Sequence, residues 1–288
     1  MLACDKKNKG FNIAVYIILV FLFLLVFIPI VYIIANSLSS PEAVNDNEVF
    51  LWPVGWDFST YWKVLSNPAI QRGFLNSFLY TLGGTALSVT LTVSVSYVLA
   101  RKDFAFKKPL SIFLLITMFI SGGLIPTYLI VKGLGLLNSP LAMILPGCLS
   151  VWNVIVCKNY IESNVPSDVI ESSKLDGASD FSIFFRIVLP MCGPIIITMV
   201  LFYGVGYWNS YFNSLLYLTK SDLFPLQRVL YDIIEKNSVE VFGASQAESI
   251  KKSIQYVSIV VSTLPIIFIY PFIGKYMEKS VSMGSVKG

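Results

Sequence analysis

The residue types that carry most enzyme chemistry are scarce or scattered in this sequence. Its 288 residues include no histidine, and the four cysteines, Cys4, Cys148, Cys157 and Cys192, show no paired spacing. A zinc or Cys/His site needs several such ligands at regular spacing, and acid–base catalysis needs a positioned proton donor and acceptor. The Gly-rich phosphate loop of an ATPase is missing as well. The sequence therefore predicts a chain that is not an enzyme, binds no metal or cofactor, and uses its cysteines as small apolar residues.

One segment combines helix signals with charged residues at regular spacing. Pro166-Ser167-Asp168 predicts a helix start, and Glu171 follows Asp168 at the spacing of a capping box. Gly177 is placed to end this short helix. The pattern predicts the first half of a helix–Gly–helix hairpin.

A second helix is predicted after the glycine, capped by Ser179 or Asp180 and stopped at Leu189-Pro190. Its apolar residues recur with the helical period. They are Phe181, Phe184, Phe185 and Val188. A short amphipathic helix must bury such a stripe against the membrane, its own subunit or another protein, and the sequence leaves these three possibilities open.

A second group of candidate residues combines aromatic rings and amides. They are Tyr207, Trp208, Asn209, Tyr211 and Asn213. Such groups suit the faces and hydroxyls of sugar rings, but Trp and Tyr also anchor proteins at the membrane–water interface. A substrate path and an interface anchor are both compatible with this pattern.

The elements that must position these residues are membrane helices. Hydrophobic residues make up 55% of the chain and charged residues only 13%, outside the usual balance of a soluble domain. A bilayer core of roughly 30 Å needs about 20 apolar helical residues per crossing. Six stretches free of Asp, Glu, Lys and Arg approach or exceed that length: residues 11–35, 74–100, 110–131, 141–157, 191–218 and 256–274. The sequence predicts an all-α integral membrane protein with six transmembrane helices.

Glycine and proline are expected to break two of these helices. Gly122, Gly123 and Pro126 interrupt the third stretch, and Pro146 with Gly147 interrupts the fourth. Broken helices persist in a bilayer where protein or water satisfies the freed backbone groups, so an interior position is predicted, with packing kinks as the alternative. The many hydroxyls of the second stretch are predicted to serve mainly in helix packing.

Positive charges indicate the orientation. Lys6, Lys7 and Lys9 precede the first stretch, and four basic residues separate the second from the third, so both segments should be cytoplasmic. Later loops carry the opposite bias, but early positive charges usually dominate topology. The predicted layout has cytoplasmic tails at 1–10 and 275–288, a membrane domain at 11–274, and outer loops at about 36–73 and 219–255.

The segment of about residues 158–190 resembles the EAA loop of bacterial ABC import permeases, written E-A-A-x3-G-x9-I-x-L-P. The matching residues are Glu171, Ser172, Ser173, Gly177, Ile187, Leu189 and Pro190, at the full spacing of the motif. Ser replaces Ala at two positions, which exchanges one small residue for another. Asp176-Gly177-Ala178 is also similar to the corresponding segment of sugar permeases.

Further segments extend the resemblance over nearly the whole chain. They are residues 121–128, 133–136, 144–147, 207–209 and 284–288. They resemble the carbohydrate-uptake class, specifically the maltose-type inner-membrane subunit and the lipo-oligosaccharide permeases. The resemblance implies a type I ABC importer permease fold in the bacterial plasma (inner) membrane. It also implies that the chain forms half of a translocation path for a carbohydrate, in particular an oligosaccharide.

The resemblance implies partners as well. In this family the EAA hairpin sits in a groove of the cytoplasmic ATPase, which implies an ATPase-coupling role for residues 171–190, with Phe181 and Phe184 among them. ATP and Mg would bind in two separate ATPase subunits. A second, homologous permease and an extracytoplasmic binding protein complete the expected assembly, in which the loop of residues 218–254, with Phe224-Pro225-Leu226, is the expected contact for the binding protein. No nucleic acid is expected.

Two other classes of protein were weighed against this one. A stand-alone channel or ion-coupled carrier predicts an ionisable residue or a filter sequence within a span, and the six stretches contain neither. A membrane scaffold without transport activity fits the composition equally well. Only the EAA-like loop argues against the scaffold.

Overall fold

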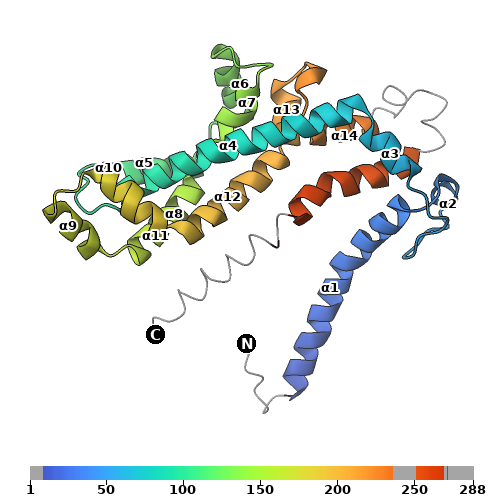
Figure 1. Ribbon diagram of the computed structural model, residues 1–288, viewed down its shortest axis with the longest axis horizontal. Helices are drawn as coiled ribbons and strands as arrows, with labels where there is room; N and C mark the ends of the chain where they lie inside the picture. The colour runs from blue at the N-terminus through green and yellow to red at the C-terminus, as the bar shows by residue number, and fades with distance from the viewer. Residues whose placement is uncertain (1–8, 236–250, 269–270, 272–288) are drawn as a thin grey trace. The chain divides into compact units, whose positions relative to one another are not determined.

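The computed structural model describes residues 9–235, 251–268 and 271 (Figure 1). Regular structure within these ranges is helical, without a strand, in agreement with the predicted all-α class. The longer helices are α1 (Lys9–Ser37), α4 (Pro68–Ala100), α5 (Lys107–Phe119), α6 (Leu124–Gly133), α8 (Val151–Asn164), α9 (Ser167–Leu175), α12 (Gly193–Trp208), α14 (Leu226–Glu235) and a helix over residues 251–268. The shorter ones are α2 (Pro41–Asn45), α3 (Ser59–Leu65), α7 (Pro140–Ile144), η1 (Leu145–Gly147), α10 (Asp180–Ile183), η2 (Phe184–Val188), α11 (Leu189–Met191), α13 (Tyr211–Tyr217) and η3 (Ser221–Leu223).

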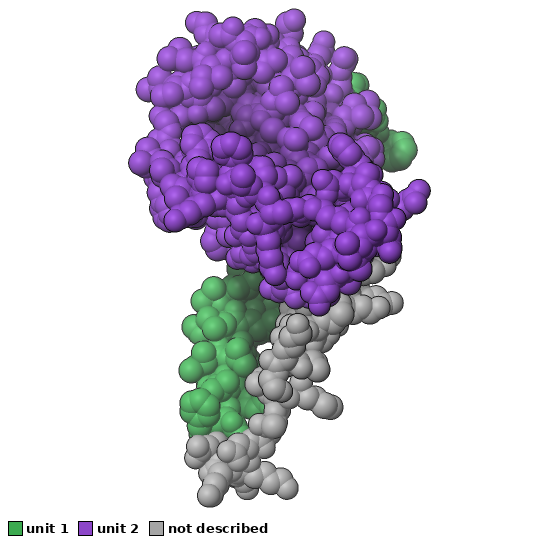
Figure 2. Space-filling view, turned by 90° about the vertical axis from the view of Figure 1, so that its left-hand side faces the viewer, with its two compact units in different colours: residues 1–71, 230–264 green, residues 72–229, 265–288 purple. Residues whose placement is uncertain are grey.

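The chain divides into two compact units, coloured green and purple in Figure 2. Unit 1 comprises residues 1–71 and 230–264. Its helix α1 is apolar along its length and exposes nearly all of its side chains, as a lipid-facing helix must. The loop after α1 is fastened to the helix end, where the Tyr61 hydroxyl donates to Ser37 Oγ at 2.8 Å. This loop exposes Trp52, Trp56 and Trp62, consistent with a position at the membrane–water interface.

Unit 2 comprises residues 72–229 and 265–288, and α4 and α12 pack together in it. Two buried tyrosines of α12 bond to hydroxyls of α4: Tyr207 Oη lies 2.9 Å from Ser88 Oγ, and Tyr203 Oη lies 2.7 Å from Thr92 Oγ1. Ser96 Oγ donates to the carbonyl of Val154 on α8 at 2.9 Å. The prediction that hydroxyls of the second stretch serve helix packing is confirmed at these three positions.

A glycine lets α4 approach α12 closely. An added Cβ at Gly84 would lie 2.6 Å from Cζ of the Tyr207 ring, a separation that real Cβ atoms do not show. The neighbouring Gly83 is different, because its Cβ would meet only Ile144 Cδ1 at an ordinary 3.6 Å. The side chain of Tyr207 therefore fits against α4 only because residue 84 has no side chain.

Three pairs of helices are bent where the chain is interrupted. The angle is 112° between α5 and α6, 54° between the 140–147 and 151–164 segments, and 79° between the 180–191 and 193–208 segments. The first two breaks fall where glycine and proline predict them, and Gly123 has a φ of +80° at the first. The third break, at Cys192 and before Pro194, lies two residues after the predicted stop at Leu189-Pro190.

Several predicted boundaries were wrong. The fourth helix continues past Cys157 to Asn164, and the fifth stretch is split by Asn209 and Ser210 into α12 and α13. Among the residues that the structure describes, two helices, α1 and α4, are long and apolar enough to cross a membrane by themselves, and up to five spans result if each bent pair is one span. The predicted sixth span corresponds to the helix over residues 251–268, and most of its continuation to residue 274 lies outside the described residues.

The segment between α13 and α14 is held on α4. Asn76 Nδ2 donates to the carbonyls of Asp222 and Phe224 at 2.8 and 3.0 Å, and the Leu226 amide donates to Ser77 Oγ at 2.8 Å. Pro225 and Leu226 are buried against their own chain, so these two residues of the predicted 218–254 contact are not available to a binding protein, whereas Phe224 is half-buried. Exposed residues of this segment include Ser221 and Asp222, whereas residues 236–250 of the predicted outer loop lie outside the described ranges.

Candidate functional site

The predicted hairpin is present at the C-terminal end of α4 (Figure 1). Helix α9 ends at Leu175, the chain turns through Asp176 and Gly177, and α10 begins at Asp180. Gly177 has a φ of +80°, a conformation that favours glycine, and its amide donates to the Lys174 carbonyl at 3.0 Å. The prediction that Gly177 shapes this turn is confirmed.

The predicted capping box is wrong. Helix α9 begins at Ser167 with Pro166 as its N-cap, and no side chain caps it, because Asp168 lies inside the first turn where it cannot act as the cap. Asp168 still places a negative charge near the helix N-terminus, which the helix dipole favours. The cap of α10 is as predicted, since Ser179 Oγ accepts from the Ser182 amide at 3.3 Å.

Residues 184–188 form a π-helix, which the helical period of the sequence did not reveal. The wider turn rotates successive side chains relative to an α-helix, so the predicted apolar stripe is divided between two directions. Val188 is fully buried in the core, and the Phe184 ring packs on Tyr97 at a centroid distance of 5.0 Å. Phe181 and Phe185 remain 78% and 58% exposed. The predicted stop at Leu189-Pro190 is also wrong, because the helical path continues to Met191.

The hairpin thus presents an apolar surface to its surroundings. We call the exposed residues Leu175, Phe181 and Phe185 the hairpin tip; Leu175, in the last turn of α9, is 89% exposed. Ile183 and Val188, in the second helical segment of the hairpin, are completely buried. Exposed aromatic and aliphatic side chains on a well-packed base are typical of a surface that binds another protein.

The other predicted coupling residues surround this surface. The hydroxyls of Ser172 and Ser173 both donate to the Val169 carbonyl, at 3.2 and 2.6 Å, so they serve α9 itself. Ala178 is half-buried and packs on the core, as do Leu189 and Phe184. Glu171, Asp176 and Pro190 are exposed, and Ile187 is half-buried.

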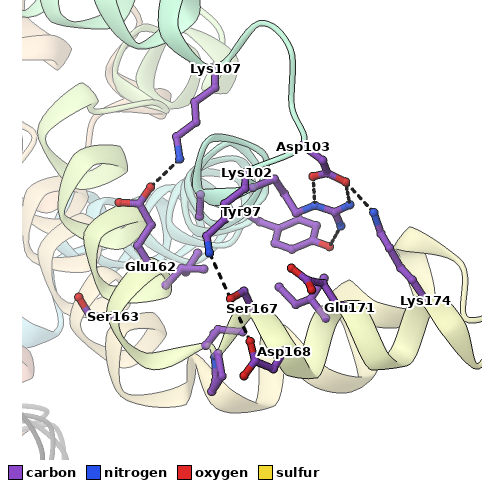
Figure 3. A pocket seen from close by; sticks show the side chains of 16 residues that line it. Tyr97, Lys102, Asp103, Lys107, Glu162, Ser163, Ser167, Asp168, Glu171 and Lys174 are labelled. Carbon is purple, nitrogen blue, oxygen red and sulfur yellow. Dashed lines mark hydrogen bonds and ion pairs between the residues drawn. The ribbon is translucent and has the colours of Figure 1, made fainter.

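A cluster of charged side chains connects the hairpin to the loop after α4 (Figure 3). Arg101 donates through Nε and Nη2 to the two carboxylate oxygens of Asp103, at 2.7 and 2.6 Å, and through Nη1 to Asp180 Oδ1 at 2.9 Å. Asp103 Oδ2 also accepts from Lys174 Nζ at 2.6 Å. We call Arg101, Asp103, Lys174 and Asp180 the Arg101 network. It joins the end of α4 to both helices of the hairpin.

The charges of the Arg101 network stabilise one another. The side chain of Arg101 is only 11% exposed, and it also donates to the Tyr97 hydroxyl at 2.8 Å. The bonds from Arg101 and Lys174 hold the pKa of the Asp103 carboxyl well below its usual range, and the same Asp103 bond raises the pKa of Arg101. The carboxylate and guanidinium therefore stay charged at neutral pH.

Beside this network lies a pocket of about 740 Å³, between the loop after α4, the end of α8 and α9. Figure 3 shows Lys107 bonded to Glu162 at 2.8 Å and Lys102 bonded to Ser167 at 3.2 Å across it. Exposed Asp168 and Glu171 line its α9 side. The charged side chains around it are joined in ion pairs, Arg101 with Asp103 and Asp180, Lys174 with Asp103, and Lys107 with Glu162.

The predicted substrate-path residues do not form one cluster. The Tyr207 hydroxyl donates to the Ile144 carbonyl at 2.9 Å in addition to its contact with Ser88, and the buried Trp208 packs edge-on against Phe74. Asn209 is exposed and donates to the Val205 carbonyl at 3.0 Å. Tyr211 and Asn213 are half-buried on α13. In this chain Tyr207 and Trp208 have packing roles.

Sequence analysis did not identify the Arg101 network. Arg101 was noted only as one of four positive charges that set orientation, and Asp180 only as a possible helix cap. The spacing of Arg101 and Asp103 could have suggested an ion pair between these two residues. It gives no indication of their contacts with Lys174 and Asp180, which lie farther along the chain.

Comparisons with known proteins agree with this architecture. Residues 88–283 match the family described as binding-protein-dependent transport system inner membrane component. The chain is 38% identical to the polygalacturonan/rhamnogalacturonan transport system permease protein YtcP of Bacillus subtilis (strain 168), over 98% of this chain and 100% of YtcP. It is 27% identical to the arabinooligosaccharides transport system permease protein AraQ of the same organism, over the whole of both chains.

A solved structure has the same fold. One chain of a bacterial ABC transporter involved in the import of the acidic polysaccharide alginate superposes with a TM-score of 0.88 at 28% identity, covering 94% of this chain and 98% of that one. The family match over residues 88–283 includes the hairpin, and the superposition shows the same fold. The chain belongs to the family of inner-membrane components of binding-protein-dependent transport systems, and it is a permease subunit of an ABC importer.

Proposed function

We propose that this chain forms half of the translocation path of an oligosaccharide importer and takes its energy from separate cytoplasmic ATPase subunits through the hairpin tip. The observation that carries the proposal is the exposure of Leu175 and Phe181 on a hairpin that is anchored by the completely buried Ile183 and Val188. A groove on an ATPase that receives these side chains would bury apolar area at a rigid contact. ATP and Mg would bind to these ATPase subunits, of which each importer would contain two.

The substrate class follows from the relatives. YtcP and AraQ are named for the transport of polygalacturonan or rhamnogalacturonan and of arabinooligosaccharides, and the structural relative imports alginate. The cargoes named for these relatives are polymers or oligomers of sugars, which supports an oligosaccharide, delivered by an extracytoplasmic binding protein, as the proposed cargo of this chain. Tyr211 and Asn213 are the members of the predicted substrate path that remain half-exposed.

A second, homologous permease is the proposed partner within the membrane. Helix α5 buries none of its side chains in this chain, and Phe119 and Ile120, at the bend to α6, are 79% and 73% exposed. The 112° bend between α5 and α6 interrupts the helical hydrogen bonds, and a lipid-facing backbone cannot leave such groups unpaired. These observations support a protein or aqueous surface, rather than lipid, at this bend.

The hairpin tip provides the direct test of this function. Replacing Phe181, which is 78% exposed, by Ser should leave the fold intact and lower the affinity for the ATPase by about 2 kcal/mol, or about 30-fold, the usual size of an aromatic hot spot. Affinity would be measured by titrating purified ATPase onto the permease pair in nanodiscs. ATP-driven uptake into proteoliposomes should fall in parallel.

Phe106→Ser is the matched control, because Phe106 is a 69% exposed aromatic residue at the start of α5 and outside the hairpin. Its ATPase affinity should equal that of the wild type. Equal binding by the Phe181→Ser and Phe106→Ser variants would contradict an ATPase-docking role for the hairpin tip. ATP-driven transport by a homodimer of this chain would contradict the proposal that a second, homologous permease is its partner.

A further inference from the structure

The hairpin is joined covalently to membrane helices of its own unit at both ends. One end follows α8 through Val165 and Pro166, and the other runs from α10 through the π-helix at Phe184–Val188 and the 79° bend at Cys192 into α12. A third connection is the Arg101 network, which begins one residue after the end of α4. These connections lead to different helices.

The Arg101 network holds both hairpin helices at their facing ends. Lys174 lies in the last turn of α9 and bonds to Asp103, whereas Asp180 is the first residue of α10 and bonds to Arg101. The bidentate pair between Arg101 and Asp103 fixes the planar guanidinium in one orientation. A displacement of either helix must therefore move the loop after α4 or break a charge-assisted bond.

The packing of α4 adds to this connection. The Tyr97 ring, one turn before Arg101, contacts Phe184 at 5.0 Å, and the Tyr97 hydroxyl accepts from Arg101. Farther along α4, Ser88 and Thr92 bond to Tyr207 and Tyr203 of α12. Helix α4 is therefore bonded to α12 along its length and to the hairpin at its C-terminal end. The hairpin in turn continues along the chain into α12.

We propose that Arg101 and Asp103 are positioning residues for energy coupling: they transmit hairpin movement to α4, so that α4 and α12 move as one body. This inference rests on the proposed function of the hairpin. Without the Arg101 network, the hairpin would keep its chain connections to α8 and α12 and the packing of Phe184 on Tyr97, but no charge-assisted bond would hold it to the end of α4. Coupling would weaken although ATPase binding would remain, because Leu175 and Phe181 of the hairpin tip take no part in the network.

The decisive variant is Lys174→Met combined with Asp180→Ala. It removes both bonds to the hairpin and leaves the pairing of Arg101 with Asp103 and Tyr97 in place. The full complex, containing this chain, its partner permease and the ATPase, would be reconstituted in proteoliposomes. Uptake per ATP hydrolysed should fall about tenfold, which lies in the lower part of the usual range of coupling free energies. ATPase binding and the amount of assembled complex should stay at wild-type values.

Lys107→Ala is the matched control. Lys107 is a charged residue that lines the same pocket, but its 2.8 Å bond joins α5 to Glu162 on α8 rather than to the hairpin. Glu162 keeps a second partner in Lys158 at 3.6 Å, so no carboxylate is left alone. The control should retain the wild-type ratio of uptake to hydrolysis.

Conservative variants separate positioning from general stability. Asp103→Ala should reproduce the tenfold loss, whereas Asp103→Glu should restore most of the coupling, because it keeps the charge within reach of Arg101 and Lys174. Wild-type coupling in the Lys174→Met/Asp180→Ala variant, or an equal loss in Lys107→Ala, would overturn the inference. A wild-type complex without any ATP-driven uptake would instead count against the proposed function.

Discussion

Gly177→Leu is expected to abolish ATP-driven uptake while leaving the permease in the membrane at normal amounts. Gly177 has a φ of +80°, and a leucine there is strained by about 1–3 kcal/mol even though no atom lies within 4 Å of the added Cβ. The turn must shift to relieve this strain, which misplaces Leu175 and Phe181 on either side of it. Membrane insertion depends on apolar length and flanking charge, so the spans should be unaffected.

The measurement is substrate-stimulated ATP hydrolysis and uptake by reconstituted complexes. Gly177→Asn is the control, because asparagine tolerates the left-handed conformation better than other residues with side chains. It should retain most of the activity. If Gly177→Leu kept both wild-type ATPase association and wild-type uptake, the hairpin would not be the coupling element.

Gly84→Ala is expected to destabilise the pairing of α4 with α12. The new methyl group would overlap the Tyr207 ring at 2.6 Å, and overpacking of this kind costs about 1–3 kcal/mol. Moving the ring also endangers the bonds of its hydroxyl to Ser88 and to the Ile144 carbonyl. The helical preference of alanine over glycine, about 1 kcal/mol, offsets only part of this cost.

Gly83→Ala is the neighbouring control, since its Cβ would make an ordinary contact of 3.6 Å with Ile144. Thermal stability of the purified permease pair in detergent should fall for Gly84→Ala and stay level or rise for Gly83→Ala. Equal melting temperatures for the two variants would mean that α4 and α12 do not approach each other as closely as described.

Local sequence determined the features that depend on neighbouring residues. Apolar length and the exclusion of charge set the membrane class, and the order of Pro166, Gly177 and Ser179 set the position of the hairpin. The breaks at Gly123 and Pro146 also follow from local backbone chemistry. Each of these depends on the conformational preferences of a few adjacent residues, which the sequence states directly.

Only the tertiary structure decided which residues meet. The pairing of Ser88 with Tyr207 joins positions far apart in the chain, as does that of Arg101 with Asp180, and no periodic pattern encodes either partner. The π-helix at Phe184–Val188 divided a stripe that an α-helical period would have kept on one face. Core packing of Val188 and Ile183 accompanies this register and leaves Phe181 and Phe185 outside, so the surface offered to a partner depends on long-range packing.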